Sequence, residues 1–154
     1  MYVLIVIALM LALPLISIVA QIIFTDHGAL QGASTLAVVA KWYVFWAVGV
    51  RLSLAGLRQI IQPRYTAETI LGLKGAEALF VVRELGFANV AMGSIGMASL
   101  IAPHWVTPAA MLGAIYYGLA GINHCLHQGR NKLQNLAMVT DLLAALLLAI
   151  CCLA

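Results

Sequence analysis

The chain has 154 residues, of which 64% are hydrophobic and only 8% are charged, and its mean hydropathy is +1.06. A soluble domain carries about 25% charged residues, without which it would expose apolar surface to water. The formal net charge of +3 comes from dispersed Lys and Arg residues, without the basic stripe of a nucleic-acid-binding protein. Composition and charge therefore exclude a soluble domain and a nucleic-acid partner, and they leave the lipid bilayer as the solvent.

The apolar runs are about twenty residues long and do not alternate with period 2. Because only helices and closed barrels satisfy their backbone groups in lipid, this pattern predicts an all-α, polytopic transmembrane helix bundle. We predict one domain over residues 1–154 with five spans, at about residues 2–24, 35–60, 75–101, 108–127 and 134–153. Pro14 predicts a kink in the first span. This span has no basic stretch before it, so we expect it to be retained and not cleaved as a signal peptide.

The connections between these spans also carry local signals. Residues 25–34 form a short polar connection, and Pro63 ends the second span before the longest connection, residues 62–74, in which residues 66–73 predict an interfacial helical turn. Trp105 suits the headgroup region. Thr107 followed by Pro108 is typical of a helix start, and residues 129–132 form a polar turn before the last span.

The basic residues of the connections predict the orientation. Two connections hold five of them: Arg58, Arg64, Lys74, Arg130 and Lys132. The other two, residues 25–34 and 102–106, hold none, so the positive-inside rule places the N-terminus in the cytoplasm and the C-terminus outside. Arg83 and Glu84 would each cost about 2.5–3.5 kcal/mol at a helix centre. Four spans would result if the third span did not insert, but the basic connections would then face opposite sides, so the charges favour five.

Polar and ionisable residues within spans are the candidates for function, since lipid makes them costly. A rise of about 1.5 Å per residue places those of four helices in the cytoplasmic half. The predicted buried polar site consists of Arg51, Arg83, Glu84, Asn89, Asn123, His124 and Asp141.

Two interpretations of this site remain open. In the structural one, Arg51 pairs with Glu84, while Arg83 reaches the headgroups or pairs with Asp141. In the functional one, the groups line a cytoplasm-facing vestibule where Glu84 or Asp141 takes up protons or cations. At the other membrane face, Lys41 is predicted to be an interfacial anchor.

Small residues recur on single helix faces and predict close helix packing. These residues are Gly49, Ser53, Gly56, Gly86, Gly93, Gly96, Gly118 and Gly121. On the third span, Glu84 lies roughly 150° around the helix from the face of Asn89 and Gly93. Because neither face suits lipid alone, we predict that the third span is the central helix of the bundle.

The sequence predicts no metal, haem or other cofactor. His27 and His104 belong to the outer connections and His124 and His127 to the inner end of the fourth span, about a membrane thickness away. His124 and His127 could share an ion only with a further ligand from elsewhere. The serine, histidine and aspartate residues show no nucleophile elbow or triad spacing, so no catalytic residue is predicted and the sequence argues against an enzyme.

The cysteines have no metal-ligand or disulfide spacing and are predicted to be small buried hydrophobes, with palmitoylation as the alternative: Cys125, Cys151 and Cys152.

Residues 83–89, with the sequence RELGFAN, are followed by Gly93 and Gly96. This stretch resembles an uncharacterised family of small bacterial polytopic membrane proteins. Residues 67–72, the Asn123-His124 pair and Asp141 are similar to that family too, so the resemblance covers roughly the C-terminal two-thirds of the chain. It implies a multi-pass protein of the bacterial inner (plasma) membrane and implies no activity.

Three functions are compatible with these features. The leading hypothesis is a small transporter- or channel-like protein, acting as a homo-oligomer, with a cytoplasm-facing polar site. The alternative is a non-catalytic accessory subunit of a larger membrane complex, suggested by the short connections and the small-residue faces. The third is an intramembrane enzyme acting on lipid or quinone.

Overall fold

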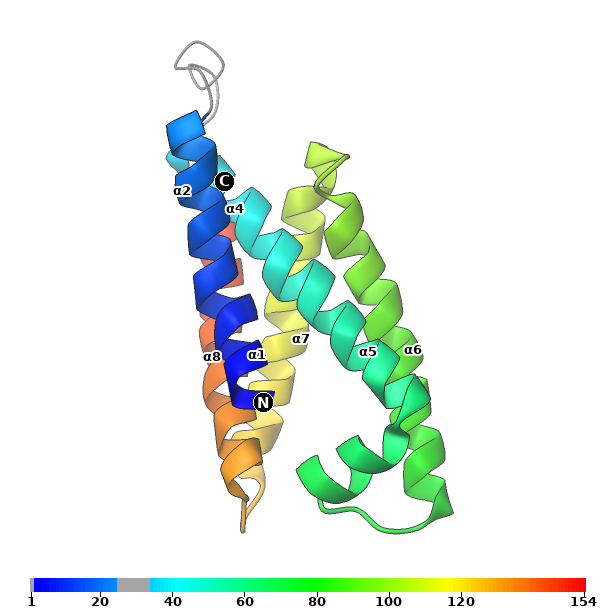
Figure 1. Ribbon diagram of the computed structural model, residues 1–154. Helices are drawn as coiled ribbons and strands as arrows, with labels where there is room; N and C mark the ends of the chain where they lie inside the picture. The colour runs from blue at the N-terminus through cyan, green and yellow to red at the C-terminus, as the bar shows by residue number, and fades with distance from the viewer. Residues whose placement is uncertain (1, 25–33) are drawn as a thin grey trace.

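The computed structural model describes residues 2–24 and 34–154. The predicted connection at residues 25–33, which includes His27, lies outside the described residues. Within the described ranges the chain is helical, without β-strands (Figure 1). Five helical spans are long and apolar enough to cross a membrane: Val3–Phe24, Thr35–Ile61, Ala76–Ala98, Pro103–Leu126 and Lys132–Cys151. The predicted all-α bundle with five spans is confirmed.

The first span contains α1 (Tyr2–Ile7), the π-helical η1 (Ala8–Ala12) and α2 (Leu13–Phe24). In the wide turn of η1, the Leu13 N–H donates to the carbonyl of Ala8, five residues back. Pro14 follows at once, and proline lacks an N–H and crowds the carbonyl four residues before it. The backbone irregularity therefore lies next to the proline for which the sequence predicts a kink.

The second span contains α4 (Thr35–Tyr43), the π-helical η2 (Val44–Val50) and α5 (Arg51–Ile61). It begins at Ser34, whose Oγ accepts a hydrogen bond from the Ala37 N–H at 3.1 Å. This span crosses the bundle diagonally (Figure 1) and is the most buried of the five, with 39% of an 18-residue apolar stretch inside the fold. It is the central element of the bundle.

The longest connection contains the short π-helix η3 (Tyr65–Ile70), where the sequence predicts an interfacial helical turn. It then turns through Gly72, whose φ of +70° suits glycine, and enters α6 (Ala76–Ala98). The 3₁₀ helix η4 (Pro103–Trp105) leads into α7 (Val106–Leu126). Asn131 and Gln134 cap the start of α8 (Lys132–Cys151) reciprocally, as in a capping box.

Helix α6 lies at the edge of the bundle, so the prediction that it is central is wrong. Only 22% of its residues are buried, the lowest share of the five spans. It packs on the second span through one face, where a Cβ added to Gly56 would lie 2.6 Å from the carbonyl oxygen of Gly86. Glycines on both helices allow this backbone approach, and the face that carries Glu84 is left exposed.

The other predicted packing residues also lie at helix interfaces. Gly49 and Ser53 of the second span meet Gly96 and Gly93 of α6 backbone to backbone. A Cβ on Gly121 would lie 2.7 Å from the side chain of Leu142 on α8. Gly118 faces the same helix more loosely, since the nearest atom to its Cβ would be 3.7 Å away.

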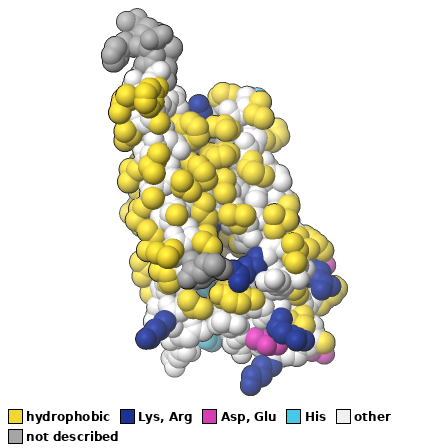
Figure 2. Space-filling model, in the orientation of Figure 1, with side chains coloured by type: hydrophobic (Ala, Val, Ile, Leu, Met, Phe, Trp, Pro, Cys, Tyr) yellow, Lys and Arg dark blue, Asp and Glu magenta, His cyan; other side chains and the backbone are white. Residues whose placement is uncertain are grey.

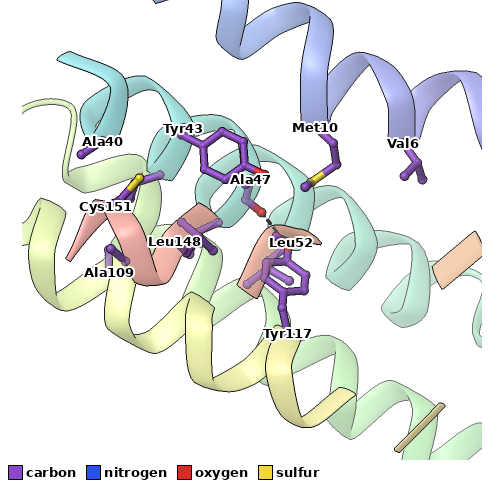
Figure 3. Close-up of a cluster of buried hydrophobic side chains, with 14 residues drawn as sticks. Val6, Met10, Ala40, Tyr43, Ala47, Leu52, Ala109, Tyr117, Leu148 and Cys151 are labelled. Atoms are coloured by element: carbon purple, nitrogen blue, oxygen red, sulfur yellow. Dashed lines mark hydrogen bonds between the residues drawn. The ribbon is translucent and has the colours of Figure 1, made fainter. Parts of the chain in front are cut away.

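A cluster of buried side chains from four spans fills the middle of the bundle (Figure 3). It includes Met10 from the first span, Tyr43 and Ala47 from the second, Tyr117 from α7 and Leu148 from α8. The Tyr117 hydroxyl donates to the carbonyl of Ala47 at 2.6 Å (Figure 3), which satisfies its polar atom inside this apolar region. The cluster separates the two ends of the bundle.

Candidate functional site

A cavity of about 460 Å³ lies between the second span, η3, α6, α7 and α8. Its volume falls in the range of roughly 300–1,000 Å³ typical of small-molecule sites. Apolar side chains form part of its wall. Its polar lining residues come from all five elements: Arg51, Arg58, Gln59, Thr66, Asn89, Tyr116, Asn123, His124 and Asp141.

A buried ion pair forms one wall of this cavity. The Nη2 atom of Arg51 donates to Oδ1 of Asp141 at 2.6 Å, and the two side chains are only 11% and 10% exposed. The guanidinium also contacts the Thr140 hydroxyl and the Met10 sulfur, each at 3.3 Å, and lies 4.6 Å from the centre of the Tyr117 ring. These contacts hold Arg51 in one place between the second span and α8.

The predicted pairing of Arg51 with Glu84 is therefore wrong, as is a pairing of Arg83 with Asp141. Helix α6 docks through its glycine face, and Glu84 lies roughly 150° around the helix from that face. Both Arg83 and Glu84 are exposed on the outer side of α6 and do not line the cavity. Neither forms an ion pair with any residue that the structure describes.

Of the predicted site residues on α6, Asn89 is the one that lines the cavity. Its side chain is only 2% exposed, and its Nδ2 donates to Oε1 of Gln59 at 2.7 Å. Its own Oδ1 is buried without a hydrogen-bond partner among the described residues. Leaving a buried acceptor unsatisfied costs about 1–3 kcal/mol. Asn89 lines the cavity, but this oxygen is itself buried, so a bound donor would reach it only after the side chain turns toward the cavity.

Arg58 also lines the cavity. From the sequence, its charge served only to predict which end of the span faces the cytoplasm. Its guanidinium carbon lies 3.8 Å from the centre of the Tyr65 ring. Its Nε is buried without a hydrogen bond, and no carboxylate within the described ranges pairs with it. The spacing does place Arg58 on the face of Arg51, about two helical turns away, but its position near the membrane face set it apart from the predicted buried site.

The end of α7 supplies the last predicted groups, the exposed Asn123 and the half-buried His124. Arg130 closes this helix, since its Nη1 donates to the carbonyls of His124 and Cys125 at 2.9 Å and of His127 at 2.6 Å. Five of the seven predicted site residues thus line one cavity: Arg51, Asn89, Asn123, His124 and Asp141.

A second, smaller cavity of about 240 Å³ lies at the opposite end of the bundle, beside Gln21 and Lys41. Oε1 of Gln21 accepts hydrogen bonds from Lys41 at 3.3 Å and from the Trp42 indole at 2.6 Å. Lys41, predicted to be an interfacial anchor, thus joins the first two spans. No cluster of three or more His, Cys, Asp or Glu side chains in the described part of the chain could hold a metal ion.

The three cysteines are free. Cys151 is buried, as predicted for a small hydrophobe, and Cys152 is half-buried. Cys125 is exposed near the end of α7, so the prediction of burial is wrong for this residue.

A model of a family of unknown function, DUF6790, matches residues 2–154, and the chain belongs to this family. The match includes the first span and so extends beyond the C-terminal part that carries the resemblance in the sequence. The expectation of an uncharacterised family is confirmed. No curated protein and no solved structure matches the chain.

Proposed function

We propose that this member of a family of unknown function is a small transporter- or channel-like protein of a bacterial inner membrane, with the 460 Å³ cavity as its solute site. The observation that carries the proposal is the convergence of polar groups from five elements on one cavity inside a membrane bundle. Intramembrane polar groups are costly and usually mark a solute or ion path. The Arg51–Asp141 pair is what a structural network would also contain, but such a network would not need a cavity beside it.

The proposed orientation places this cavity on the cytoplasmic side. Lys and Arg side chains gather at the end of the molecule that holds η3 and the α7–α8 connection (Figure 2). The cavity lies at that end, since Thr66 of η3 and His124 of α7 line it. The positive-inside rule then supports a cytoplasmic N-terminus.

The second cavity supports a transport function. It lies at the opposite end of the bundle, and the buried cluster around Tyr43 and Leu148 separates it from the first. Two cavities with an apolar barrier between them suit a protein in which a solute passes from one side to the other when the barrier opens. The buried Tyr43 hydroxyl has no hydrogen-bond partner among the described residues, so it could bond to a passing solute.

Replacing Asn89 by leucine is expected to slow solute flux at least about tenfold, because it removes two polar groups from the cavity wall. Proteoliposomes are challenged with isosmotic glycerol, potassium lactate or potassium phosphate, with valinomycin to carry the compensating potassium, and their swelling is followed by light scattering. At least one solute should enter faster than in protein-free liposomes.

Glu77→Gln is the matched control, because Glu77 is exposed at the start of the same helix and lies outside the cavity. Its flux should equal that of the wild type. The proposal is overturned if no solute enters faster than in empty liposomes. It also falls if Asn89→Leu lowers stability while every flux is unchanged, since the cluster would then be structural.

We also propose that a second copy of the chain covers the outer face of α6. Arg83 and Glu84 are exposed there, about 10 and 12 Å from the start of the helix, where lipid would surround them. A two-fold axis along the membrane normal places both copies at the same depth. Arg83 of one copy can then pair with Glu84 of the other, and the reverse pair follows from symmetry. Ala88 and Ala91 on the same side allow close approach.

Arg83→Glu is expected to dissociate this dimer, because two acidic residues on each helix would face two on the other. Adding Glu84→Arg restores the opposite charges and should restore the dimer. The mass of the detergent-solubilised protein, measured by light scattering with correction for detergent, distinguishes the two states. A monomeric wild type contradicts the proposal. A different protein that co-purifies from native membranes through Arg83 and Glu84 would instead support the accessory-subunit hypothesis.

A further inference from the structure

We infer that the cavity binds an oxyanion, a carboxylate or a phosphate, and that Arg58 is the residue that recognises it. The inference rests on the proposed function only in that it takes this cavity as the solute site. It adds the chemical class of the ligand, and three observations on the cavity wall support it.

The first observation is the charge of the wall. Among the described residues, two guanidinium groups and one carboxylate line the cavity. Arg51 is held against Asp141 at 2.6 Å, so these two charges neutralise each other. The charge of Arg58 remains, and it leaves the wall formed by the described residues with a net positive charge. A cation would be repelled by this wall, and a neutral solute would leave the charge uncompensated.

The second observation is the environment of Arg58. The Tyr65 ring covers the guanidinium at 3.8 Å, which attracts the cation but supplies no lone pair for its N–H groups. The Nε is buried and makes no hydrogen bond with any described residue. A guanidinium presents its donors as a rigid fork that matches two oxygens of a carboxylate or phosphate. An oxyanion in the cavity would compensate the charge of Arg58, and the buried Nε would gain an acceptor once the side chain turns toward the ligand.

The third observation concerns the rest of the ligand. The buried Oδ1 of Asn89 lacks a donor among the described residues, and an O–H or N–H group on the ligand would satisfy it once the Asn89 side chain turns toward the cavity. Leu52, Leu85 and Leu119 supply apolar wall beside these polar groups. A hydroxyl-bearing acid or a phosphate ester fits these requirements. Both a free cytoplasmic metabolite and the headgroup of an anionic phospholipid have this chemistry.

Binding to the whole protein in detergent tests the inference. Isothermal titration with glycerol 3-phosphate probes a free anion. Native mass spectrometry after addition of phosphatidylglycerol, with phosphatidylcholine as the comparison, probes a lipid headgroup. We expect at least one of the two anionic probes to bind, and phosphatidylcholine to be retained less than phosphatidylglycerol. Arg58→Gln should raise the Kd of the bound anion at least tenfold. Arg58→Lys, which keeps the charge and loses the fork, should have a smaller effect.

Arg64→Gln is the matched control, because Arg64 is exposed on the neighbouring connection and only pairs with Glu68 at the surface. It should leave the Kd unchanged. Melting temperatures of all variants show whether Arg58→Gln folds. If Arg58→Gln does not fold, the Kd of Arg58→Lys, which keeps the charge, tests the inference in its place. The inference is overturned if neither anion binds, or if Arg64→Gln weakens binding as much as Arg58→Gln.

The inference and the transport proposal can fail separately. Anion binding that depends on Arg58, without any flux into proteoliposomes, supports the binding site and contradicts transport. Flux of glycerol that is unchanged in Arg58→Gln, together with no anion binding, supports transport and contradicts the inference.

Discussion

Replacing Asp141 by leucine is expected to lower the free energy of unfolding by about 3–5 kcal/mol, the largest effect of any single substitution considered. The Asp141 carboxylate lies 2.6 Å from the Arg51 guanidinium, and both side chains are nearly buried. Removing the carboxylate leaves the nearly buried Arg51 cation without this counter-ion. Unfolding by SDS, followed by circular dichroism in mixed micelles, measures the loss.

The double variant Arg51→Met with Asp141→Leu provides the control. It removes both charges together, and replacing a buried ion pair by apolar residues of similar size is often close to neutral. We therefore expect it to recover most of the stability that Asp141→Leu loses. If Asp141 stabilised the fold by contacts other than this ion pair, the double variant would not recover stability. The ion pair would then not be the cause of the loss in Asp141→Leu.

Replacing Gly56 by alanine is expected to destabilise the protein by about 1–3 kcal/mol, although alanine is the better helix former. The added methyl group would lie 2.6 Å from the carbonyl oxygen of Gly86 and 2.8 Å from the Val90 side chain. Because the oxygen belongs to the α6 backbone, it cannot rotate away. The two helices must separate, and the close contact along Gly49, Gly56 and Gly86 is lost. The same SDS titration measures the effect.

Gly118→Ala is the matched substitution on a looser interface. Its methyl group would lie 3.7 Å from the Ala145 Cβ, which is ordinary van der Waals contact. We expect stability to be unchanged or to rise by up to about 1 kcal/mol through helix propensity. Equal losses at Gly56 and Gly118 would show that the α5–α6 contact is no tighter than the α7–α8 contact.

Much of the architecture follows from short-range properties of the chain. Hydropathy over about twenty residues decides whether a segment spans a bilayer, and it needs no knowledge of the neighbouring helices. The five spans could therefore be predicted, as could the helical turn near residues 66–73 and the disturbance beside Pro14. The packing role of the glycines could also be predicted, because small residues repeated on one helix face usually allow another helix to approach closely.

The candidate site was only partly predictable. Depth along a helix follows from residue spacing, which is why Arg51, Asn89 and Asp141 could be grouped before any contact was known. The depth of a residue in the membrane does not show which other helix its side of the helix contacts. Glu84 has a suitable depth for Arg51 but points away from the bundle, and Arg58 enters the cavity although it lies near the membrane face.

By itself, the sequence thus determined the membrane class, the number of spans and the residues whose burial would be costly, since these depend on the composition of single helices. Only the tertiary structure decided that Asp141 pairs with Arg51, that α6 lies at the edge and that Arg58 faces the cavity without a counter-ion among the described residues. These outcomes depend on the rotation of each helix about its axis and on the order of helices around the bundle. Both are set by the fit of glycine faces from distant segments, such as Gly56 against Gly86, which no local pattern encodes.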